Sequence, residues 1–451
     1  MHDTVIRGGQ IVTPDGLLHA DVAIDDGRFA AIAPELPSAR EEIDARGLVV
    51  LPGAIDVHLH FNEPGRSEWE GIATGSRALA AGGGTLFFDM PLNSSPCTLD
   101  GATFDLKREA MERSSITDFG LWGGLTPESL PALDELAGRG VIGFKAFMSD
   151  SGLPEFARAD DLTLFEGMRI AARHALPVAV HAESEDLTKA LAARIRAAGG
   201  TGVRDYLNSR PVLAELEAIQ RAALFAKETG ARLHIVHVSS GRGVALAAEL
   251  RAAGADITIE TCAHYLFFTG EDMERLGAVA KCAPPLRPAD EQARLWETLL
   301  RGDIDIVASD HSPSSPDLKN DPDFFRVWGG IAGAQSTLSV LLEAGFEARG
   351  LSLAAIARLT ASTPAHRFRI ADKGAIKTGF DADCTLIHLN EPSTLTADQL
   401  HYKHKTSPYI GTMFRAAIRR TIRRGDTIAL DGSITAKTNG HLVKPSQGSN
   451  A

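Results

Sequence analysis

Cysteine is scarce in this chain, and no two cysteines stand close together in the sequence. Four occur among 451 residues, and no CxxC pair is present. This spacing argues against a disulfide framework and against a thiolate zinc site, and it is typical of free thiols in a reducing compartment. The four are Cys97, Cys262, Cys282 and Cys384.

Signals for membranes and for nucleic acid are lacking as well. Residues 1–7 show no charged stretch followed by an apolar core, so we expect no signal peptide and a cytoplasmic protein. No apolar run is long enough to span a bilayer. The formal net charge is -12, from 46 basic and 58 acidic residues, and no long basic run interrupts this balance. We therefore expect neither nucleic acid nor an anionic membrane as a partner.

The composition that remains is that of an ordinary globular protein, with 44% hydrophobic and 23% charged residues. A chain of this length has room for two or three domains, or for one large barrel with an added domain. Residues 1–50 alternate short apolar strands with turns such as Pro14-Asp15-Gly16, which predicts a small antiparallel sheet. That segment is too short to enclose a full core of its own.

Residues 51–370 show a different pattern, in which apolar strands alternate with helical stretches. Eight strand–helix units predict an α/β fold, a (β/α)8 TIM-like barrel, with an open doubly wound sheet as the alternative. Strand signals return over residues 371–451, so we expect both chain ends to form one small composite β-sandwich domain. The polar segment 437–451 is expected to fray. The predicted barrel strands lie near Val57 and at 85–90, 118–122, 143–147, 178–181, 233–237, 257–261 and 304–310.

Two histidines, His58 and His60, lie at the end of the first predicted barrel strand. A spacing of two residues places both imidazoles on the same side of a strand. Neutral imidazole is a good ligand for zinc and related ions, so this pair could hold one metal ion. A bare HxH is more often a pair of ordinary histidines, and only the position of other ligand-type residues favours a metal site here.

Such residues stand at the ends of several other predicted strands. Lys145 lies in strand four, His181 ends strand five, His237 ends strand six and Asp310 ends strand eight. Because the active sites of such barrels lie at the carboxyl ends of the strands, we expect all six side chains at one mouth. His234 lies three residues before His237, so strict alternation predicts that it faces the other way and has a structural role.

Lys145 is the unusual member, because an ammonium ion has no lone pair and would repel a metal. Its amine could capture carbon dioxide, and the resulting carbamate could bridge two divalent ions, for which zinc is suitable. The simpler interpretation is a lysine whose head pairs with a carboxylate. Two ions ~3.5–4 Å apart can make hydroxide available at neutral pH and polarise a carbonyl. Asp310 could then be the catalytic general base and later general acid, or only a ligand.

These residues give the chain a resemblance to the cyclic amidohydrolases, the group that holds dihydroorotases, hydantoinases and allantoinases. The resemblance runs over residues 8–432 and implies a binuclear metal barrel with a composite β domain. It also implies a homo-oligomer, commonly a tetramer. By this resemblance carboxylated Lys145 is shared by two ions, one completed by His58, His60 and Asp310 and the other by His181 and His237.

Within the group, the resemblance is strongest to the allantoinases. It is carried by EPGRSEWEG at 63–71, MPLNS at 90–94, WGGIAG at 328–333 and HKTSPY at 404–409. Dihydroorotases typically have an arginine two residues after the second histidine, where it holds the substrate carboxylate, and here that residue is Asn62. Allantoin has no carboxylate, and a bidentate arginine is hard to replace. The implied reaction is hydrolysis of the hydantoin ring amide of allantoin to allantoate.

Substrate contacts are expected from loops at the barrel mouth, and loops 90–96 and 149–154 are expected to border the pocket. For each candidate a simpler role is open, since an asparagine can form a turn and glycines can merely shape a loop. His264 could support the ligands or be a satisfied core histidine. The substrate-contact candidates are Asn93, Ser151, Ser312, Gly330 and Gly333.

Two alternative functions stay open. The chain could be another ring-opening amidohydrolase that acts on hydantoins, dihydropyrimidines or dihydroorotate, because substrate choice lies in loops that a sequence constrains poorly. It could also be a catalytically silent relative with a structural or interaction role. Such a relative should have lost metal ligands, whereas all six candidates are present in this chain.

Overall fold

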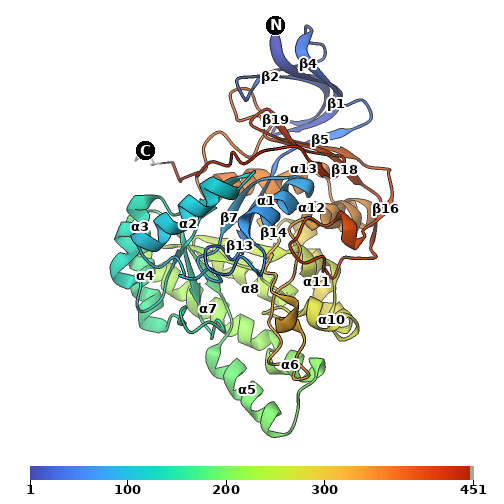
Figure 1. Ribbon diagram of the computed structural model, residues 1–451. Coiled ribbons are helices and arrows are strands. Elements are labelled where there is room, and N and C mark those ends of the chain that lie inside the picture. The colour runs from blue at the N-terminus through green and yellow to red at the C-terminus, as the bar shows by residue number, and fades with distance from the viewer. Residues whose placement is uncertain (447–451) are drawn as a thin grey trace.

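The computed structural model describes residues 1–446 and consists of a closed barrel with a β domain packed against one end (Figure 1). The barrel wall has eight parallel strand positions, the third of which is divided at Trp122. This confirms the predicted barrel and its eight strands. The strands are β6 (Ala54–Leu59), β7 (Gly84–Asp89), β8 (Asp118–Leu121) with β9 (Gly123–Gly124), β10 (Phe144–Phe147), β11 (Pro177–His181), β12 (Arg232–Ile235), β13 (Ile257–Cys262) and β14 (Ile306–Ala308).

The barrel closes between its first and last strands, which excludes the open sheet. Leu59 in β6 pairs in parallel with His311, three residues beyond the end of β14. The backbone N–H of His60 donates to the carbonyl of His311 at 2.8 Å. Inside the ring, apolar side chains such as Val57, Phe88 and Ile306 pack into a buried core.

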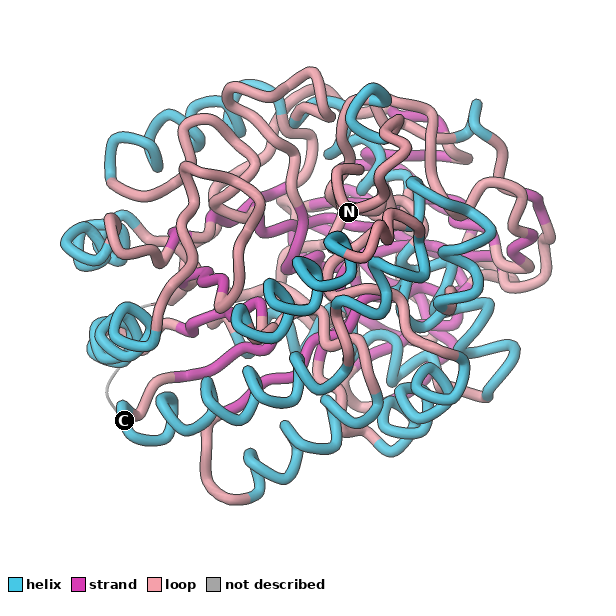
Figure 2. The backbone as a smooth tube through the Cα atoms, turned by 90° about the horizontal axis from the view of Figure 1, so that it is seen from below, coloured by secondary structure: helices cyan, strands magenta, loops and turns pink. Residues whose placement is uncertain are grey.

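Helices surround the strands on the outside (Figure 2). Several begin at a side-chain cap: Asp100, Asp160 and Ser240 each accept a hydrogen bond from the N–H three residues later. The α-helices are α1 (Ile72–Ala81), α2 (Gly101–Ser114), α3 (Leu133–Arg139), α4 (Asp161–Arg173), α5 (Glu185–Ala197), α6 (Val203–Ser209), α7 (Val212–Thr229), α8 (Gly241–Ala252), α9 (Ala263–Phe267), α10 (Gly270–Leu276), α11 (Ala289–Arg301), α12 (Thr337–Val340), α13 (Leu353–Ala357) and α14 (Thr363–Arg367). Two π-helical turns, Leu341–Glu347 and Arg358–Ser362, follow α12 and α13.

The β domain is built from both ends of the chain, as predicted. Its nine strands belong to one hydrogen-bonded sheet, in which the N-terminal and C-terminal parts meet as neighbouring antiparallel strands. The division of the chain at residues 50 and 370 stays a prediction. The strands are β1 (His2–Thr13), β2 (Gly16–Asp25), β3 (Arg28–Ala33), β4 (Ala39–Asp44), β5 (Val49–Pro52), β15 (Cys384–His388), β18 (Ala417–Arg423), β19 (Asp426–Leu430) and β20 (Ser433–Ile434), with the small pair β16 (Ser393–Thr394) and β17 (Met413–Phe414) beside them.

The polar segment near the C-terminus does not fray over the part that the structure describes, so that prediction is wrong there. The N–H of Phe119 in β8 donates to the carbonyl of His441 at 3.0 Å, and the N–H of Val443 donates to the carbonyl of Phe119 at 2.7 Å. Val443 is buried in the barrel core. The segment therefore adds a short parallel bridge to β8, while residues 447–451 lie outside the described part.

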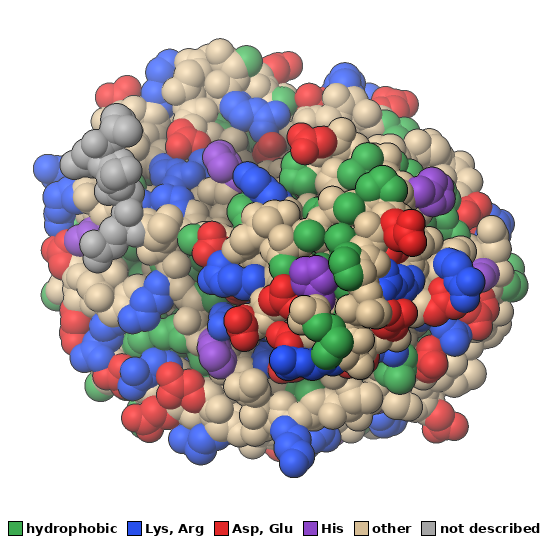
Figure 3. All heavy atoms as spheres, turned by 90° about the horizontal axis from the view of Figure 1, so that it is seen from above, with side chains coloured by type: hydrophobic (Ala, Val, Ile, Leu, Met, Phe, Trp, Pro, Cys, Tyr) green, Lys and Arg blue, Asp and Glu red, His purple; other side chains and the backbone are tan. Residues whose placement is uncertain are grey.

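The outer surface shows no excess of one charge on the face drawn in Figure 3, where acidic and basic side chains are interspersed. Between residues 1 and 446, no helix is both long and apolar enough to cross a bilayer.

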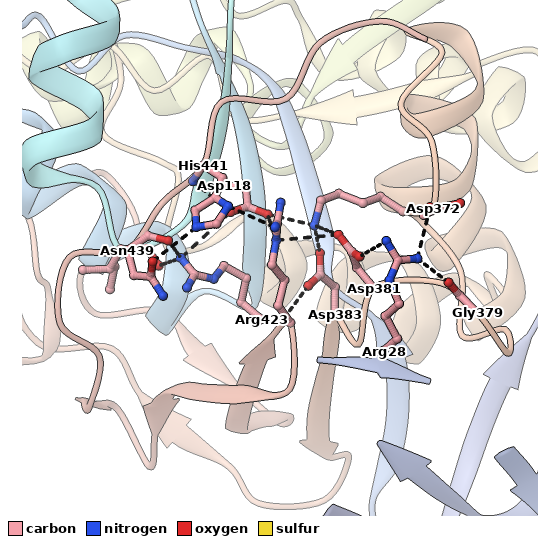
Figure 4. A network of polar contacts seen from close by, with 12 residues as sticks. Arg28, Asp118, Asp372, Gly379, Asp381, Asp383, Arg423, Asn439 and His441 are labelled. Carbon is pink, nitrogen blue, oxygen red and sulfur yellow. Dashed lines mark hydrogen bonds and ion pairs between the residues drawn. The ribbon is translucent and has the colours of Figure 1, made fainter. Parts of the chain in front are cut away.

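A buried ion network joins the β domain, the barrel and the C-terminal segment (Figure 4). The ammonium of Lys373 lies 2.8 Å from Asp118, 3.0 Å from Asp381 and 2.7 Å from Asp383. Asp118 also accepts hydrogen bonds from Arg424 at 2.9 Å and from the backbone N–H of residue 441 at 3.0 Å. These charges are stable inside the protein only because each faces a partner of opposite sign.

We predict that Lys373→Met lowers the free energy of unfolding by roughly 3–5 kcal/mol, because it leaves buried carboxylates without their shared cation. Urea unfolding monitored by circular dichroism measures the change. Lys377→Met removes an exposed lysine nearby and is the matched control. A loss below about 1 kcal/mol for Lys373→Met, in the range of exposed ion pairs, would contradict the role given to the network.

Candidate active site

Five of the six predicted ligand residues line one cavity of about 480 Å³ at the carboxyl ends of the strands. They reach it from four strands, because β6, β11, β12 and β14 end at the same rim. Lys145, in β10, is fully buried and does not line the cavity wall. Helices α5 and α6 project beyond this end of the barrel, opposite the β domain (Figure 1). The five lining residues are His58, His60, His181, His237 and Asp310.

The first group within the site consists of His58, His60 and Asp310. Nε2 of His58 lies 3.3 Å from Oδ1 of Asp310, and Nε2 of His60 lies 3.5 Å from the same oxygen. One potential ligand atom from each residue lies within 4.8 Å of the other two. Burial would raise the pKa of Asp310, but the two imidazoles lower it below the usual range. Three lone-pair donors therefore face one point.

The second group is formed by His181 and His237. Nδ1 of His181 lies 3.1 Å from Nε2 of His237, and the ring of His237 lies 5.3 Å from that of His58. Burial lowers the pKa of both imidazoles, and it lowers the pKa of His60 too. All three rings are consequently neutral near pH 7 and keep a lone pair for a cation.

Lys145 has an unsatisfied amine in this polar surrounding. Its Nζ is buried and forms no hydrogen bond within residues 1–446. Burial lowers its pKa to about 8, so a neutral amine is accessible near neutral pH. Nζ lies 4.9 Å from the ring centre of Phe147, which in turn stacks on His181 at 4.6 Å. The sequence alternative in which this ammonium pairs with a carboxylate is not what the structure shows.

These observations fit the metal ions that the resemblance implies. The donors are neutral imidazoles and an ionised carboxylate, which suit zinc and neighbouring divalent ions. The orphaned amine of Lys145 is the group that would need a further reaction, since an unmodified ammonium has nothing to bond there. The arrangement can therefore accommodate cations next to a cavity of substrate size.

Glu183 and Arg210 orient His181 through its Nε2, the ring nitrogen that does not face His237. Oε2 of Glu183 lies 2.9 Å from Nε2 of His181, and the same carboxylate pairs with the guanidinium of Arg210. Burial opposes ionisation, but Arg210 and His181 lower the pKa of Glu183 to about 2. An ionised carboxylate only accepts hydrogen bonds, so Nε2 of His181 carries the proton and Nδ1 stays free.

Glu260, in the middle of β13, does the same for His58. Its Oε1 lies 2.8 Å from Nδ1 of His58, which leaves Nε2 free toward Asp310. Its other oxygen lies 2.9 Å from Nε2 of His234. Burial would raise the pKa of Glu260, but the two histidines lower it to about 2. One carboxylate thereby sets the orientation of two rings.

His234 lies inside the barrel with His237, and the predicted opposite face is wrong. It contacts Glu260 and lies parallel to the indole of Trp122 at 6.2 Å. β12 ends at Ile235, and His237 has φ 41°, so the alternation of a strand is broken between the two histidines. The structural role expected for His234 agrees with these contacts.

The backbone is strained where the site residues leave their strands. Asp310 has φ 43° and Asn93 has φ 70°, in the left-handed region that L-residues rarely adopt. Such conformations occur where the surrounding structure holds a side chain in a required direction. In this molecule they turn side chains from the ends of β7 and β14 toward the cavity.

The substrate-contact candidates separate into two sets. Asn93, Ser151, Ser312 and Gly330 line the cavity, whereas Gly333 is not among the lining residues of the described chain. The amide of Asn93 donates to the hydroxyl of Ser312 at 3.2 Å across the mouth. The hydroxyl of Ser151 donates to the carbonyl of Phe156 at 2.7 Å within its own loop.

Both glycines already use their backbone N–H groups inside the protein. The N–H of Gly330 donates to the carbonyl of Lys281 at 2.7 Å, and that of Gly333 donates to Nδ1 of His311 at 3.1 Å. A Cβ at Gly330 would lie 2.0 Å from the carbonyl of Ser312. Gly330 therefore shapes the cavity wall by its lack of a side chain.

The loops predicted to border the pocket do so, since Leu92 and Asn93 line it from one and Asp150 to Gly152 from the other. Arg66 joins the two loops: it donates to the carbonyl of Asn93 at 3.2 Å and pairs with Glu155. His264 is buried outside the lining residues, with a pKa lowered to about 4 by burial.

Sequence reasoning missed Glu183, Glu260 and the cavity-lining Lys281. A signal existed for the two glutamates. Glu183 stands two residues after a strand-end histidine, and Glu260 is a lone charge in an otherwise uncharged buried strand. A charge in such a place requires a partner inside the barrel. Arg210, the partner of Glu183, also lines the cavity.

Comparison with known proteins agrees with this geometry. A protein named allantoinase from Solibacter usitatus is 63% identical over 445 residues, 99% of this chain and 97% of that protein. An allantoinase from Rubrobacter xylanophilus is 55% identical and covers 98% of both chains. The solved structure of an L-hydantoinase (dihydropyrimidinase) from Arthrobacter aurescens superposes with a TM-score of 0.96 at 34% identity, covering 98% of this chain and 100% of that one.

A family model also matches most of this chain. Residues 49–428, which include the entire barrel and part of the β domain, match the description "Amidohydrolase family". With the family matched over most of its length and relatives well above 30% identity, this chain belongs to the amidohydrolase family.

Proposed function

We propose that this protein hydrolyses the hydantoin ring amide of allantoin to allantoate. The observation that carries the proposal is 63% identity to an allantoinase over 99% of the chain, and it is supported by five of the six candidate ligands, which line one cavity. In the reaction, water adds to the ring carbonyl carbon and the ring C–N bond breaks. The products are a carboxylate and a free ureido nitrogen.

We further propose that the site holds two divalent ions, with zinc as the first candidate. His58, His60 and Asp310 would hold one, His181 and His237 the other, and a carboxylated Lys145 would be shared. When bound, such ions make hydroxide available near neutral pH and polarise a carbonyl. The support from this chain is the set of neutral imidazoles, the ionised Asp310 and the unsatisfied amine of Lys145.

The chain's own residues then bind the substrate, orient the histidines and move the proton. Asp310 lies at the cavity wall with an ionised carboxylate, so it takes the proton of the attacking water and returns it to the leaving ring nitrogen. Glu183 and Glu260 hold His181 and His58 in a single tautomer throughout. Asn93, which lines the same cavity as Asp310, offers an amide that matches the donors and acceptors of the substrate ring.

A second candidate is the hydrolysis of a hydantoin or a dihydropyrimidine. It is favoured by the TM-score of 0.96 to the L-hydantoinase, which covers nearly all of both chains. A dihydroorotate-type substrate is disfavoured, because Asn62 takes the place of the arginine that would bind its carboxylate. The amide of Asn62 is buried and donates to the carbonyl of Pro313 at 3.2 Å, away from the cavity lining.

The proposal includes a homo-oligomer, most simply a tetramer, and a cytoplasmic location. The assembly comes from the resemblance alone. The location is supported by the free cysteines, all four of which are buried. Light scattering of the purified protein would measure the assembly.

We predict that the purified protein converts allantoin to allantoate and contains about two metal ions per chain, as a bridged pair requires. Chelation should abolish the activity, and added zinc should restore it. Colorimetric detection of allantoate and elemental analysis of the same sample measure both. A metal-loaded protein that opens hydantoin but leaves allantoin intact would select the second candidate, and a metal-free protein that stays inert after reconstitution would support a silent relative.

We predict that Asp310→Asn lowers kcat for allantoin by about 10²–10⁴-fold, the usual contribution of a general acid–base group. Steady-state kinetics on metal-reconstituted protein measure the effect. Asp317→Asn changes an exposed aspartate in the same loop and should leave kcat unaltered. Retention of more than a tenth of the activity in Asp310→Asn would remove this residue from the proton transfer.

We predict that Glu183→Gln weakens metal binding about 10–100-fold, because a neutral amide no longer holds His181 with its Nδ1 free. Competition with a chelator of known affinity gives the dissociation constant without any assay of activity. Glu228→Gln, at an exposed glutamate on α7, serves as the control. Equal affinity in the variant and the parent protein would show that His181 keeps its tautomer without the carboxylate.

A further inference from the structure

One wall of the cavity is a single stretch of chain, residues 324–330, which we call the cavity segment. It belongs to the long loop between β14 and α12, and residues 325–330 all line the cavity. No helix or strand stabilises it from within. Its conformation must therefore come from contacts with other parts of the molecule.

Two lysines provide most of these contacts. The ammonium of Lys281 donates to the carbonyls of Phe324 at 2.6 Å, Phe325 at 3.3 Å and Val327 at 2.5 Å. The ammonium of Lys319 donates to the carbonyls of Trp328 at 2.9 Å and Gly330 at 2.7 Å. Five of the seven carbonyls of the cavity segment thus face one of two ammonium groups. 

The positions of these lysines are energetically unusual. Lys281 is buried, Lys319 is half-buried, and neither forms a salt bridge in the described part of the chain. Burial lowers the pKa of Lys281 to about 7, so the ammonium gives up solvation that the carbonyls only partly replace. Their carbonyl partners lie mainly in one segment, which indicates that both serve to order it.

Lys281 is itself held rigidly. Its Nζ lies 4.6 Å from the ring centre of Tyr206 and 5.2 Å from that of Phe324, so aromatic faces flank the cation. Tyr206, in α6, donates its hydroxyl to the carbonyl of Cys282 at 2.9 Å. The backbone carbonyl of Lys281 accepts the N–H of Gly330, so one residue holds both ends of the cavity segment.

Gly329, which lies between Trp328 and Gly330, keeps its backbone polar groups available to a ligand. Gly329 lines the cavity, and its backbone N–H and carbonyl form no hydrogen bond in the described part of the chain. Its neighbours Trp328 and Gly330 are fixed by Lys319. Trp328 also meets Trp69 edge to face, with the ring centres 4.9 Å apart.

We propose that Lys281 and Lys319 are positioning residues that hold the cavity segment in the shape required to bind the cyclic amide and to discriminate among its ring substituents. The inference rests on the proposed function, because it assigns the segment to substrate binding. Neither ammonium group bonds to any of the six candidate ligand residues, since all the hydrogen-bond acceptors of both groups in the described chain are backbone carbonyls. Their removal should therefore act on binding and on substrate choice more than on the chemical step.

The test compares Lys281→Met and Lys319→Met with Lys189→Met, which removes an exposed lysine on α5. Hydrogen–deuterium exchange of peptides that cover 324–330 is measured on the metal-reconstituted protein without substrate. KM and kcat are then determined for allantoin and for unsubstituted hydantoin, with metal content determined on each sample. If Lys281→Met does not fold, Lys319→Met decides the outcome, because its side chain is half-exposed.

We expect exchange in the cavity segment to become about tenfold faster or more in each lysine variant, since charged hydrogen bonds are lost. KM for allantoin should rise roughly tenfold with a smaller change in kcat, and the preference for allantoin over hydantoin should shrink. Metal content and the control variant should match the parent protein. This pattern separates positioning from a general loss of stability, which would leave KM unchanged.

Unchanged exchange in the cavity segment would overturn the inference, because the segment would then be ordered without the lysines. Faster exchange with unaltered KM and unaltered substrate preference would overturn it too, by showing that the segment does not bind the substrate. Failure of the parent protein to open allantoin would defeat the proposed function. The exchange measurement would still decide whether the lysines order the segment.

Discussion

The closure of the barrel between β6 and β14 is the constraint on which the site depends. The parallel bridge from Leu59 to His311 brings the first strand beside the last, although about 250 residues separate them in the chain. Because His58 and His60 lie at the end of one strand and Asp310 follows the other, closure places three ligand-type side chains at one point. An open doubly wound sheet would not have brought the first and last strands side by side.

Burial then sets the protonation states of the groups at the site. Inside the barrel mouth, loss of solvent lowers the pKa of His60, His181 and His237 and that of Lys145, so these nitrogen groups are available as neutral donors. The same loss of solvent would neutralise carboxylates, yet Glu183 and Glu260 stay ionised because each faces buried cationic or hydrogen-bonding partners. The site is therefore a set of neutral bases held in place by fixed negative charges.

Away from the candidate ligands, lysine ammonium groups order the chain in two places. Lys373 gathers three carboxylates between the β domain and the barrel, which joins separate parts of the chain at the end away from the mouth. Lys281 and Lys319 instead gather backbone carbonyls, which gives a definite shape to a loop that has no regular structure. In each case an ammonium group withdrawn wholly or partly from solvent orders elements that apolar packing alone would leave undetermined.

The sequence by itself was sufficient for the eight barrel strands, the composite β domain and the ligand-type residues at strand ends, because those features follow from local periodicity and from the order of elements. Only the tertiary structure decided which residues orient the candidate ligands and which residues shape the cavity wall. The partners Glu260 and His234 come from different strands, and a positive φ at His237 overrides the alternation that a sequence suggests. The lysines of the cavity wall are equally invisible in sequence, since their partners are backbone carbonyls that carry no residue signature.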